Sequence, residues 1–217
     1  MTLDIITSDS LAPLRHGFFG RQGGASSGIF GGLNCGYGSS DQHEAVAINR
    51  GRVAAALGLE ADRLIGVHQL HSADVVVVTD PETPRPSADA MATNLPGVAL
   101  TVLTADCQPV LFADPVAGVI GAAHAGWKGA LAGVLGKTVD AMEALGAQRD
   151  RINAVIGPTI SQRAYEVGPE FFDAFIAEDP SFARFFAGGE GDRMMFDLPA
   201  LGLHLLRQAG IANAEWT

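Results

Sequence analysis

The stretch "PVLFADPVAGVIGAAHA", residues 109–125, decides the fold of this chain. Two runs of apolar and β-branched residues, 109–114 and 119–125, flank Pro-Val-Ala-Gly, a sequence typical of turns. Both runs are short, which favours strands over helices. We therefore predict a β-hairpin here, and further strands from similar runs at 64–67, 74–78, 98–105, 152–157 and 193–197.

Helical spacing of apolar residues appears between these strands. One predicted helix begins at Asp41, which forms a capping-box pattern with Glu44, and ends at Gly58. Further predicted helices cover 127–146, 169–178, 180–187 and 198–210. Hairpins mixed with single helices indicate the α+β class, a mixed α/β sandwich rather than a doubly wound sheet.

The composition bounds the class of protein. With 217 residues, 47% of them hydrophobic and 18% charged, the chain suits a single soluble globular domain over 1–217. A net charge of -10 repels a phosphate backbone, so nucleic acid is not an expected partner. The N-terminus lacks signal-peptide features, and no uncharged apolar run approaches the ~18 residues of a membrane span. We expect a cytoplasmic protein, monomeric or dimeric, with no membrane partner.

Candidate metal ligands lie at or just beyond the ends of predicted strands. They are His71, Cys107 and His124. A thiolate and two imidazoles would fill three of the four positions around Zn²⁺ and leave the fourth open for water or substrate. Asp106 could orient a ligand or transfer protons. The alternatives are a small buried thiol and ordinary core or loop histidines. His68 should point away from the face that His71 uses, because the two residues are three positions apart in an extended segment, where side chains alternate between faces.

Candidate substrate contacts come mainly from the glycine-dense segment 15–38, which indicates tight turns around a wide loop. Arg21 suits recognition of phosphate or carboxylate, and Ser26 and Asn34 could add neutral donors. Gln69 is another candidate, although a glutamine bonded to backbone is an equal alternative. The start of the helix predicted at 127–146 would add an anion-binding helix end.

Several blocks of the sequence together resemble the polyphenol oxidase (laccase-domain) family, also called peptidoglycan editing factors. Members of that family are largely regarded as zinc-dependent purine nucleoside phosphorylases. The likeness extends from about residue 15 to the end, and the blocks occur in the family's order. They are "FFGRQGGASSGIFGGLNCGYGSSD" (18–41), "VHQLHS" (67–72), "ADAM" (88–91), "TADCQPVLFAD" (104–114), "AAHAGWKG" (122–129) and "IGPTISQRAYEVGPE" (156–170).

The resemblance implies one laccase domain, a sandwich of the cysteine-hydrolase type with helices packed outside its sheets. It implies zinc held by His71, Cys107 and His124. The implied reactions are phosphorolysis of adenosine, inosine, guanosine and methylthioadenosine, and hydrolytic deamination of adenosine, with nucleoside and phosphate as partners. Members usually continue beyond "AEWT" (214–217) with a tail, so either this sequence stops short of that tail or the protein lacks it.

The same resemblance places Arg21, Gln69 and Asp106 on motif positions near the metal. Other functions stay open at this stage. A cysteine hydrolase or amidase acting on peptidoglycan precursors would use Cys107 as nucleophile and a histidine as base. A copper oxidase would need more imidazoles than the 6 histidines present for a multicopper cluster, although a lone copper suits the same ligands. A purely structural zinc would require a closed site.

Overall fold

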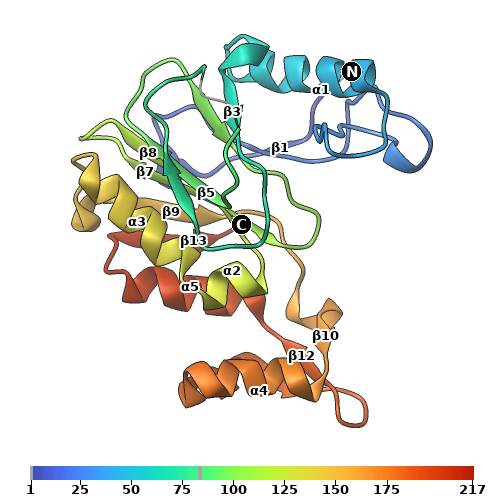
Figure 1. Cartoon of the computed structure of the whole chain (residues 1–217), viewed down its shortest axis with the longest axis vertical. Helices are drawn as coiled ribbons and strands as arrows, with labels where there is room; N and C mark the ends of the chain where they lie inside the picture. Colours follow the sequence, from blue (N-terminus) through green and yellow to red (C-terminus); the bar gives the residue numbers. More distant parts are fainter. Residues whose placement is uncertain (1, 83–84) are drawn as a thin grey trace.

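The centre of the molecule is a mixed β-sheet, seen in a computed structural model that describes residues 2–82 and 85–217 (Figure 1). The order of its six strands is β13-β9-β7-β8-β5-β4. The antiparallel pair β7–β8 is the predicted hairpin, with Gln108 opposite Ala125 and Asp114 opposite Val119. The strands are β4 (Val75–Val77), β5 (Ala90–Thr93), β7 (Gln108–Asp114), β8 (Val119–Ala125), β9 (Asn153–Ile156) and β13 (Asn213–Trp216).

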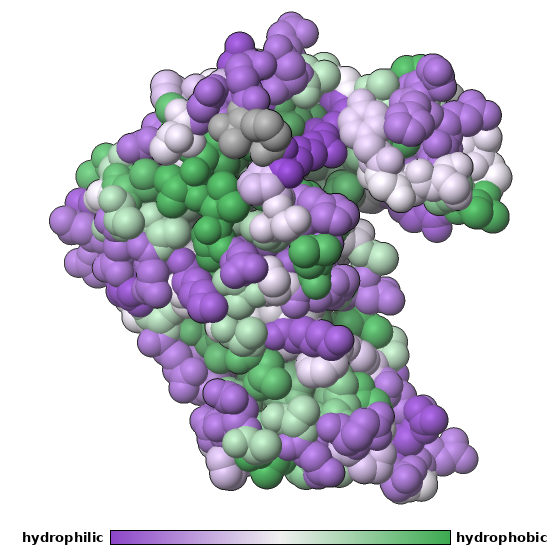
Figure 2. Space-filling model, in the orientation of Figure 1, coloured by the Kyte–Doolittle hydropathy of each residue, from purple (hydrophilic) through white to green (hydrophobic). Residues whose placement is uncertain are grey.

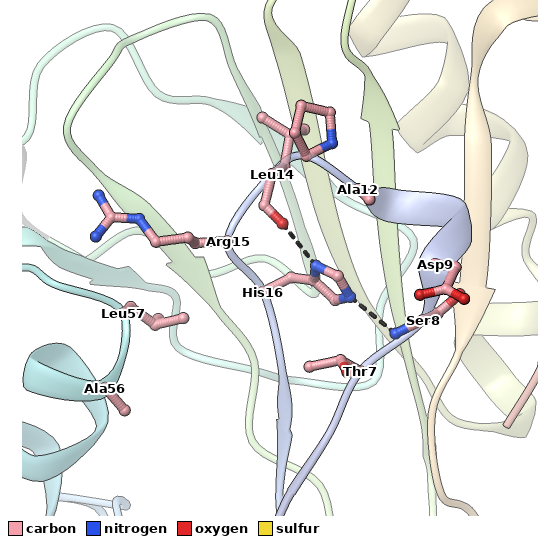
Figure 3. Close-up of a pocket in the computed structure, with 10 residues that line it drawn as sticks. Thr7, Ser8, Asp9, Ala12, Leu14, Arg15, His16, Ala56 and Leu57 are labelled. Atoms are coloured by element: carbon pink, nitrogen blue, oxygen red, sulfur yellow. Dashed lines mark hydrogen bonds between the residues drawn. The ribbon is translucent and has the colours of Figure 1, made fainter.

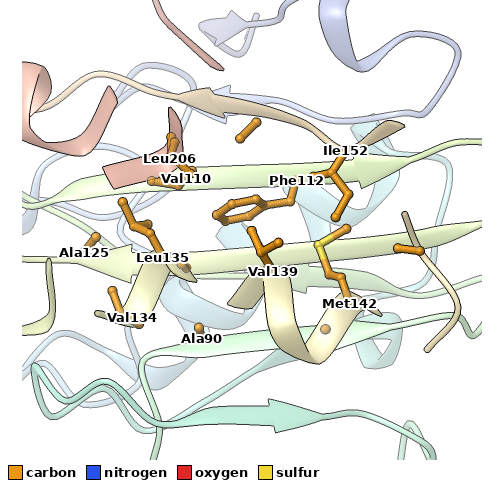
Figure 4. Close-up of a cluster of buried hydrophobic side chains, with 14 of the residues drawn as sticks. Ala90, Val110, Phe112, Ala125, Val134, Leu135, Val139, Met142, Ile152 and Leu206 are labelled. Carbon is orange, nitrogen blue, oxygen red and sulfur yellow. The ribbon is translucent and has the colours of Figure 1, made fainter. Parts of the chain in front are cut away.

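Helices α3 (Val134–Ala144) and α5 (Leu198–Gln208) cover one face of this sheet (Figure 1). Figure 4 shows Leu135, Val139 and Met142 of α3 directed at Phe112 of β7. These three α3 side chains are fully buried, as the helical spacing predicted. Each such burial stabilises the fold by about 1.5–3 kcal/mol, so this layer fixes the sheet that carries the site.

The helix predicted at 127–146 is broken in two. Gly133 has φ 87°, a left-handed conformation that ends α2 (Trp127–Leu131) before α3 begins. Glycine adopts that conformation without steric cost. The prediction of one continuous helix was therefore wrong, and α2 is a short α-helix of five residues between β8 and α3.

Helix α1 (His43–Ala56) lies away from the large sheet, against the parallel pair β3 (Leu64–Gly66) and β6 (Ala99–Thr101) and the glycine-rich segment. Its N-cap is Gln42, so the capping box predicted from Asp41 does not form. The inner face of α1 includes Asn49 and Arg50, both buried. Asn49 donates to the carbonyl of Asn34 in the glycine-rich segment, and Arg50 donates to the carbonyl of Leu64 in β3. Strands β1 (Ile5–Ile6) and β2 (Phe18–Phe19) form a short antiparallel pair.

The segment after β9 projects at the end opposite α1 (Figure 1). It contains β10 (Glu166–Val167), α4 (Pro169–Glu178), β11 (Phe186–Gly188) and β12 (Met194–Phe196) around an aromatic core. The second predicted helix of this region is instead a 3-10 turn followed by β11, because only 180–185 is helical. The 3-10 turns are Asp9–Leu11, Gly28–Phe30, Ala61–Arg63, Arg149–Arg151, Gln162–Ala164 and Pro180–Phe185.

The mixed α/β architecture with helices outside the sheets is confirmed, and the cysteine-hydrolase type stays a prediction. Strands β5 and β13 were not predicted. Strand β5 pairs with β4 on one side and β8 on the other, and β13 pairs in parallel with β9. Within 2–82 and 85–217, none of the helices combines the length and the apolar character that crossing a bilayer requires.

Candidate metal centre

Three side chains predicted as metal ligands converge in the structure. The ligand atoms of His71, Cys107 and His124 all lie within 4.8 Å of one another. Cys107 Sγ is 3.8 Å from His71 Nε2, and the two imidazole rings meet edge-on at 78° with centroids 4.8 Å apart. Ligands of one tetrahedral Zn²⁺ lie roughly 3.3–3.8 Å apart at ordinary bond lengths. The donor set therefore fits a single metal ion with small side-chain movements.

The β7–β8 register brings Cys107 and His124 together. Pro109 pairs with His124, so the ladder continued past Gln108 places Cys107 beside Gly126. A Cβ on Gly126 would lie 2.7 Å from Cys107 Sγ and 3.0 Å from His71 Cδ2. Only a residue without a side chain leaves room for the thiol and the imidazole at this point.

Asp89, immediately before β5, is the buried polar residue around which the centre is organised. Its Oδ1 accepts hydrogen bonds from His124 Nδ1 at 2.8 Å and from the backbone N–H of His71 at 2.9 Å. Its Oδ2 accepts from the N–H groups of Leu70 at 3.0 Å and Ser72 at 2.7 Å. The sequence reasoning missed Asp89, although it stands in the "ADAM" block of the resemblance.

Burial dominates the electrostatics of the centre. It lowers the pKa of His124, which keeps that imidazole neutral and able to bind a metal. Burial also raises the pKa of Cys107, and the charges of Asp106 and Asp89 add to this effect. Asp89 differs, because the hydrogen bonds from His124 and the amides of 70–72 outweigh burial and lower its pKa. The thiol of the metal-free protein must therefore release a proton when a metal binds.

Asp106 and Tyr165 adjoin this group. The Asp106 residue is exposed, and its backbone carbonyl accepts hydrogen bonds from Thr159 Oγ1 at 2.7 Å and Ile160 N–H at 2.9 Å. Burial raises the pKa of Tyr165 to about 12, with further contributions from the charges of Cys107 and Asp106. Tyr165 was not predicted as a site residue, and it packs against the aromatic core of the segment after β9. The proton-transfer role of Asp106 remains a prediction.

The four predicted substrate contacts are engaged in internal hydrogen bonds. Arg21 is exposed and donates from Nη2 to the carbonyl of Gly31 at 3.0 Å. Ser26 and Asn34 belong to a network with α1, in which Ser26 Oγ accepts from Asn49 and Asn34 Nδ2 donates to Asp41. The side-chain amide of Gln69 donates to the backbone C=O of Leu103 and accepts from its N–H. None of these four belongs to the metal group, and their binding of substrate stays a prediction.

The anion site predicted at the start of 127–146 is not supported. Helix α2 has five residues, too few for a strong helix dipole, and Lys128 lies over the Trp127 ring at 5.5 Å. His68 does not belong to the metal group, in agreement with its predicted separation from His71. Its backbone forms an isolated β-bridge with Ser87.

The structure also has a hollow in its surface and a cavity away from the metal group. In Figure 2 the molecule is hollowed between the lobe at the upper right, where the glycine-rich segment lies in Figure 1, and the body below. A separate cavity of about 350 Å³ is formed by residues 7–9, 12–16 and 56–57 (Figure 3). There His16 uses both ring nitrogens, on Ser8 N–H and Leu14 C=O, so that cavity does not offer a free imidazole.

Comparison with known proteins places this geometry in context. Residues 15–217 match the family described as multi-copper polyphenol oxidoreductase laccase. A purine nucleoside phosphorylase of Deinococcus radiodurans is 42% identical over 218 residues, covering 97% of this chain and 81% of that relative. Purine nucleoside phosphorylase ORF3 of Streptomyces griseus is 48% identical over 163 residues, covering 74% of this chain and 66% of the relative. The crystal structure of Neisseria meningitidis protein NMB0706 superposes with a TM-score of 0.89 at 34% identity, covering 100% of this chain and 87% of that one.

Proposed function

The chain belongs to the multi-copper polyphenol oxidoreductase laccase family, and from this premise we propose that it is a zinc-dependent purine nucleoside phosphorylase. The observation that carries the proposal is the convergence of His71, Cys107 and His124 within 4.8 Å. The relatives named purine nucleoside phosphorylase support the reaction class. The proposed substrates are adenosine, inosine, guanosine and methylthioadenosine, and we include hydrolytic deamination of adenosine as a second reaction.

Zinc is the proposed metal because the donor set is one thiolate and two imidazoles, a common zinc combination with an open fourth position. When bound there, zinc supplies a Lewis acid at the reacting end of the substrate. The family's description names copper, but a multicopper cluster needs more imidazoles than the 6 histidines of the chain. A single copper is the minor alternative, and metal analysis separates the two.

The proposed phosphorolysis breaks one bond at the anomeric carbon of the ribose and forms another. A phosphate oxygen bonds to the anomeric carbon of the ribose while the C–N bond to the base breaks, and its electron pair leaves with the purine, which gains a proton. We assign Asp106 to proton transfer, because it is exposed, directly precedes Cys107 in the chain and acts electrostatically on that thiol. We assign phosphate recognition to Arg21, whose guanidinium keeps donors beyond the one used on Gly31. The further proposed substrate contacts are Ser26 and Asn34, in the same glycine-rich segment as Arg21, and Gln69, in the block 67–72.

A cysteine hydrolase acting on peptidoglycan precursors is the second candidate, because Cys107 Sγ and His71 Nε2 are 3.8 Å apart. A nucleophilic cysteine needs a lowered pKa, whereas burial and the neighbouring carboxylates raise the pKa of Cys107. A bound metal removes that obstacle by holding the thiolate, so the metal enzyme is favoured.

The test combines metal analysis with product analysis. Purified protein should contain about one zinc per chain, the stoichiometry of a single tetrahedral site, and release free base from a nucleoside panel only when phosphate is present. Inosine formed from adenosine without phosphate would report deamination. Cys107→Ala should lose both metal and base release, and the matched control Cys35→Ala should keep both, since Cys35 is a partly buried thiol outside the group. Full zinc occupancy without turnover of any nucleoside would refute the proposed reaction.

A further inference from the structure

We propose that Asp89 is the positioning residue of the metal centre, one buried carboxylate that sets the orientation of both histidine ligands. This inference rests on the proposed metal site and is independent of the nucleoside chemistry. Asp89 is fully buried, and its two oxygens accept hydrogen bonds from one imidazole and three consecutive backbone amides. A carboxylate with four donors is held in one geometry, and it holds its donors in turn.

The first effect is on the ring of His124. Asp89 Oδ1 is an acceptor 2.8 Å from His124 Nδ1, so that nitrogen carries the proton and Nε2 is left to bind the metal. The backbone N–H of His124 also donates to the Asp89 carbonyl, at 2.7 Å. Ring and main chain of this ligand are thus both tied to the same residue, which fixes the imidazole plane as well as its tautomer.

The second effect is on the backbone of His71. Its φ is 60°, the single positive value among the non-glycine residues that the structure describes. Such a conformation costs a non-glycine residue about 1–3 kcal/mol and persists only where the surroundings impose it. His71 is an exposed residue, so burial in a core does not impose this backbone conformation. The hydrogen bonds from Leu70, His71 and Ser72 to Asp89 supply that constraint.

A second buried carboxylate provides a matched control. Asp114, at the other end of β7, is also fully buried and accepts from the amides of Val116, Ala117 and Gln148. Its contacts do not include any of the three ligands. Loss of either carboxylate should lower stability, but only loss of the Asp89 carboxylate should change metal binding.

The experiment measures zinc affinity of folded, metal-free protein by competition with a chromophoric chelator. In Asp89→Asn the new NH₂ group faces backbone N–H donors, and the acceptor for His124 is weakened. Affinity should fall about 10–100-fold, the usual effect of removing a partner of a ligating histidine. Asp114→Asn should keep the wild-type affinity. Wild-type affinity in Asp89→Asn would overturn the proposal.

A measurement on the wild-type protein removes the dependence on folding of the variant. Long-range ¹⁵N–¹H spectra of the metal-free protein should show His124 as the Nδ1–H tautomer. The Nε2–H tautomer would overturn the proposal even if Asp89→Asn does not fold. Failure of the wild-type protein to bind zinc would instead refute the proposed function, and the tautomer would still decide whether Asp89 orients His124.

Discussion

Substitution of Gly126 by alanine adds a single methyl group to the metal centre. Gly126 has φ -68° and ψ 169°, an extended conformation that alanine adopts without strain, so the backbone tolerates the change. The new Cβ would lie 2.7 Å from Cys107 Sγ, whereas non-bonded heavy atoms rest at about 3.5–4.0 Å. The thiol must therefore retreat by roughly 1 Å, and the His71 ring, at 3.0 Å, must shift as well.

A displacement of this size exceeds the tolerance of metal–ligand bonds, which is about 0.2 Å. We expect zinc affinity to fall by at least about 100-fold, equivalent to ~2.7 kcal/mol. The assay is thermal unfolding with and without zinc. The wild-type protein should gain stability from the metal, and Gly126→Ala should gain less by about that amount, because only binding to the folded state stabilises it.

The control is Gly136→Ala in α3, where an added Cβ meets nothing within 4 Å. It should bind zinc as the wild-type protein does and be slightly more stable, by about 0.5–1 kcal/mol, because alanine is the better helix former. If Gly126→Ala binds zinc with wild-type affinity, then the three side chains do not share one ion and the steric reasoning is wrong.

Three further changes test other parts of the molecule. Gly133→Ala should lower the free energy of unfolding by about 1 kcal/mol in urea titrations, since alanine is strained at φ 87°; no change would mean that the α2–α3 break tolerates a side chain. Burial alone would raise the pKa of Asp114, but hydrogen bonds from Gln148, Ala117 and Arg151 lower it in the folded protein. The ionised carboxylate therefore stabilises the fold at pH values above its unfolded pKa of about 3.9, and this stabilisation is lost as the pH falls through the folded pKa. Asp114→Asn should therefore flatten the loss of urea resistance below about pH 4, and an unaltered pH profile would exclude this contribution. Asn49→Ala should cost about 2–4 kcal/mol and expose the glycine-rich loop to proteases, because the buried amide bonds four loop groups; unchanged proteolysis would contradict that role.

The ligand pair Cys107 and His124 was predictable because it depends on a local hairpin. A turn between two short apolar runs fixes an antiparallel register, and the register places residues near the open ends of the strands side by side. His71 could be nominated from its residue type and position alone. Its approach to the pair depends on β4, β5 and the turn at 70–72, which bring distant segments together, and no local pattern reports that.

Strand β5 escaped prediction for a related reason. Ala90–Thr93 is buried on both faces, so it has no polar alternation, and half of it is alanine, which favours helices. Partners on both sides impose the strand. The break at Gly133 was equally hidden, because a glycine in a periodic apolar segment is compatible with a helix until the packing of α3 demands a turn.

The residue that escaped prediction most completely, Asp89, explains how an exposed histidine can serve in a fixed site. Local pattern favours no carboxylate at a buried strand end, since burial without partners is costly. Here the partners are the amides of 70–72 and the ring of His124, so satisfying Asp89 and shaping the centre are the same set of hydrogen bonds. A buried acid at this position is therefore tolerated only when the turn carrying His71 is docked. We infer that the centre forms together with the fold of β5.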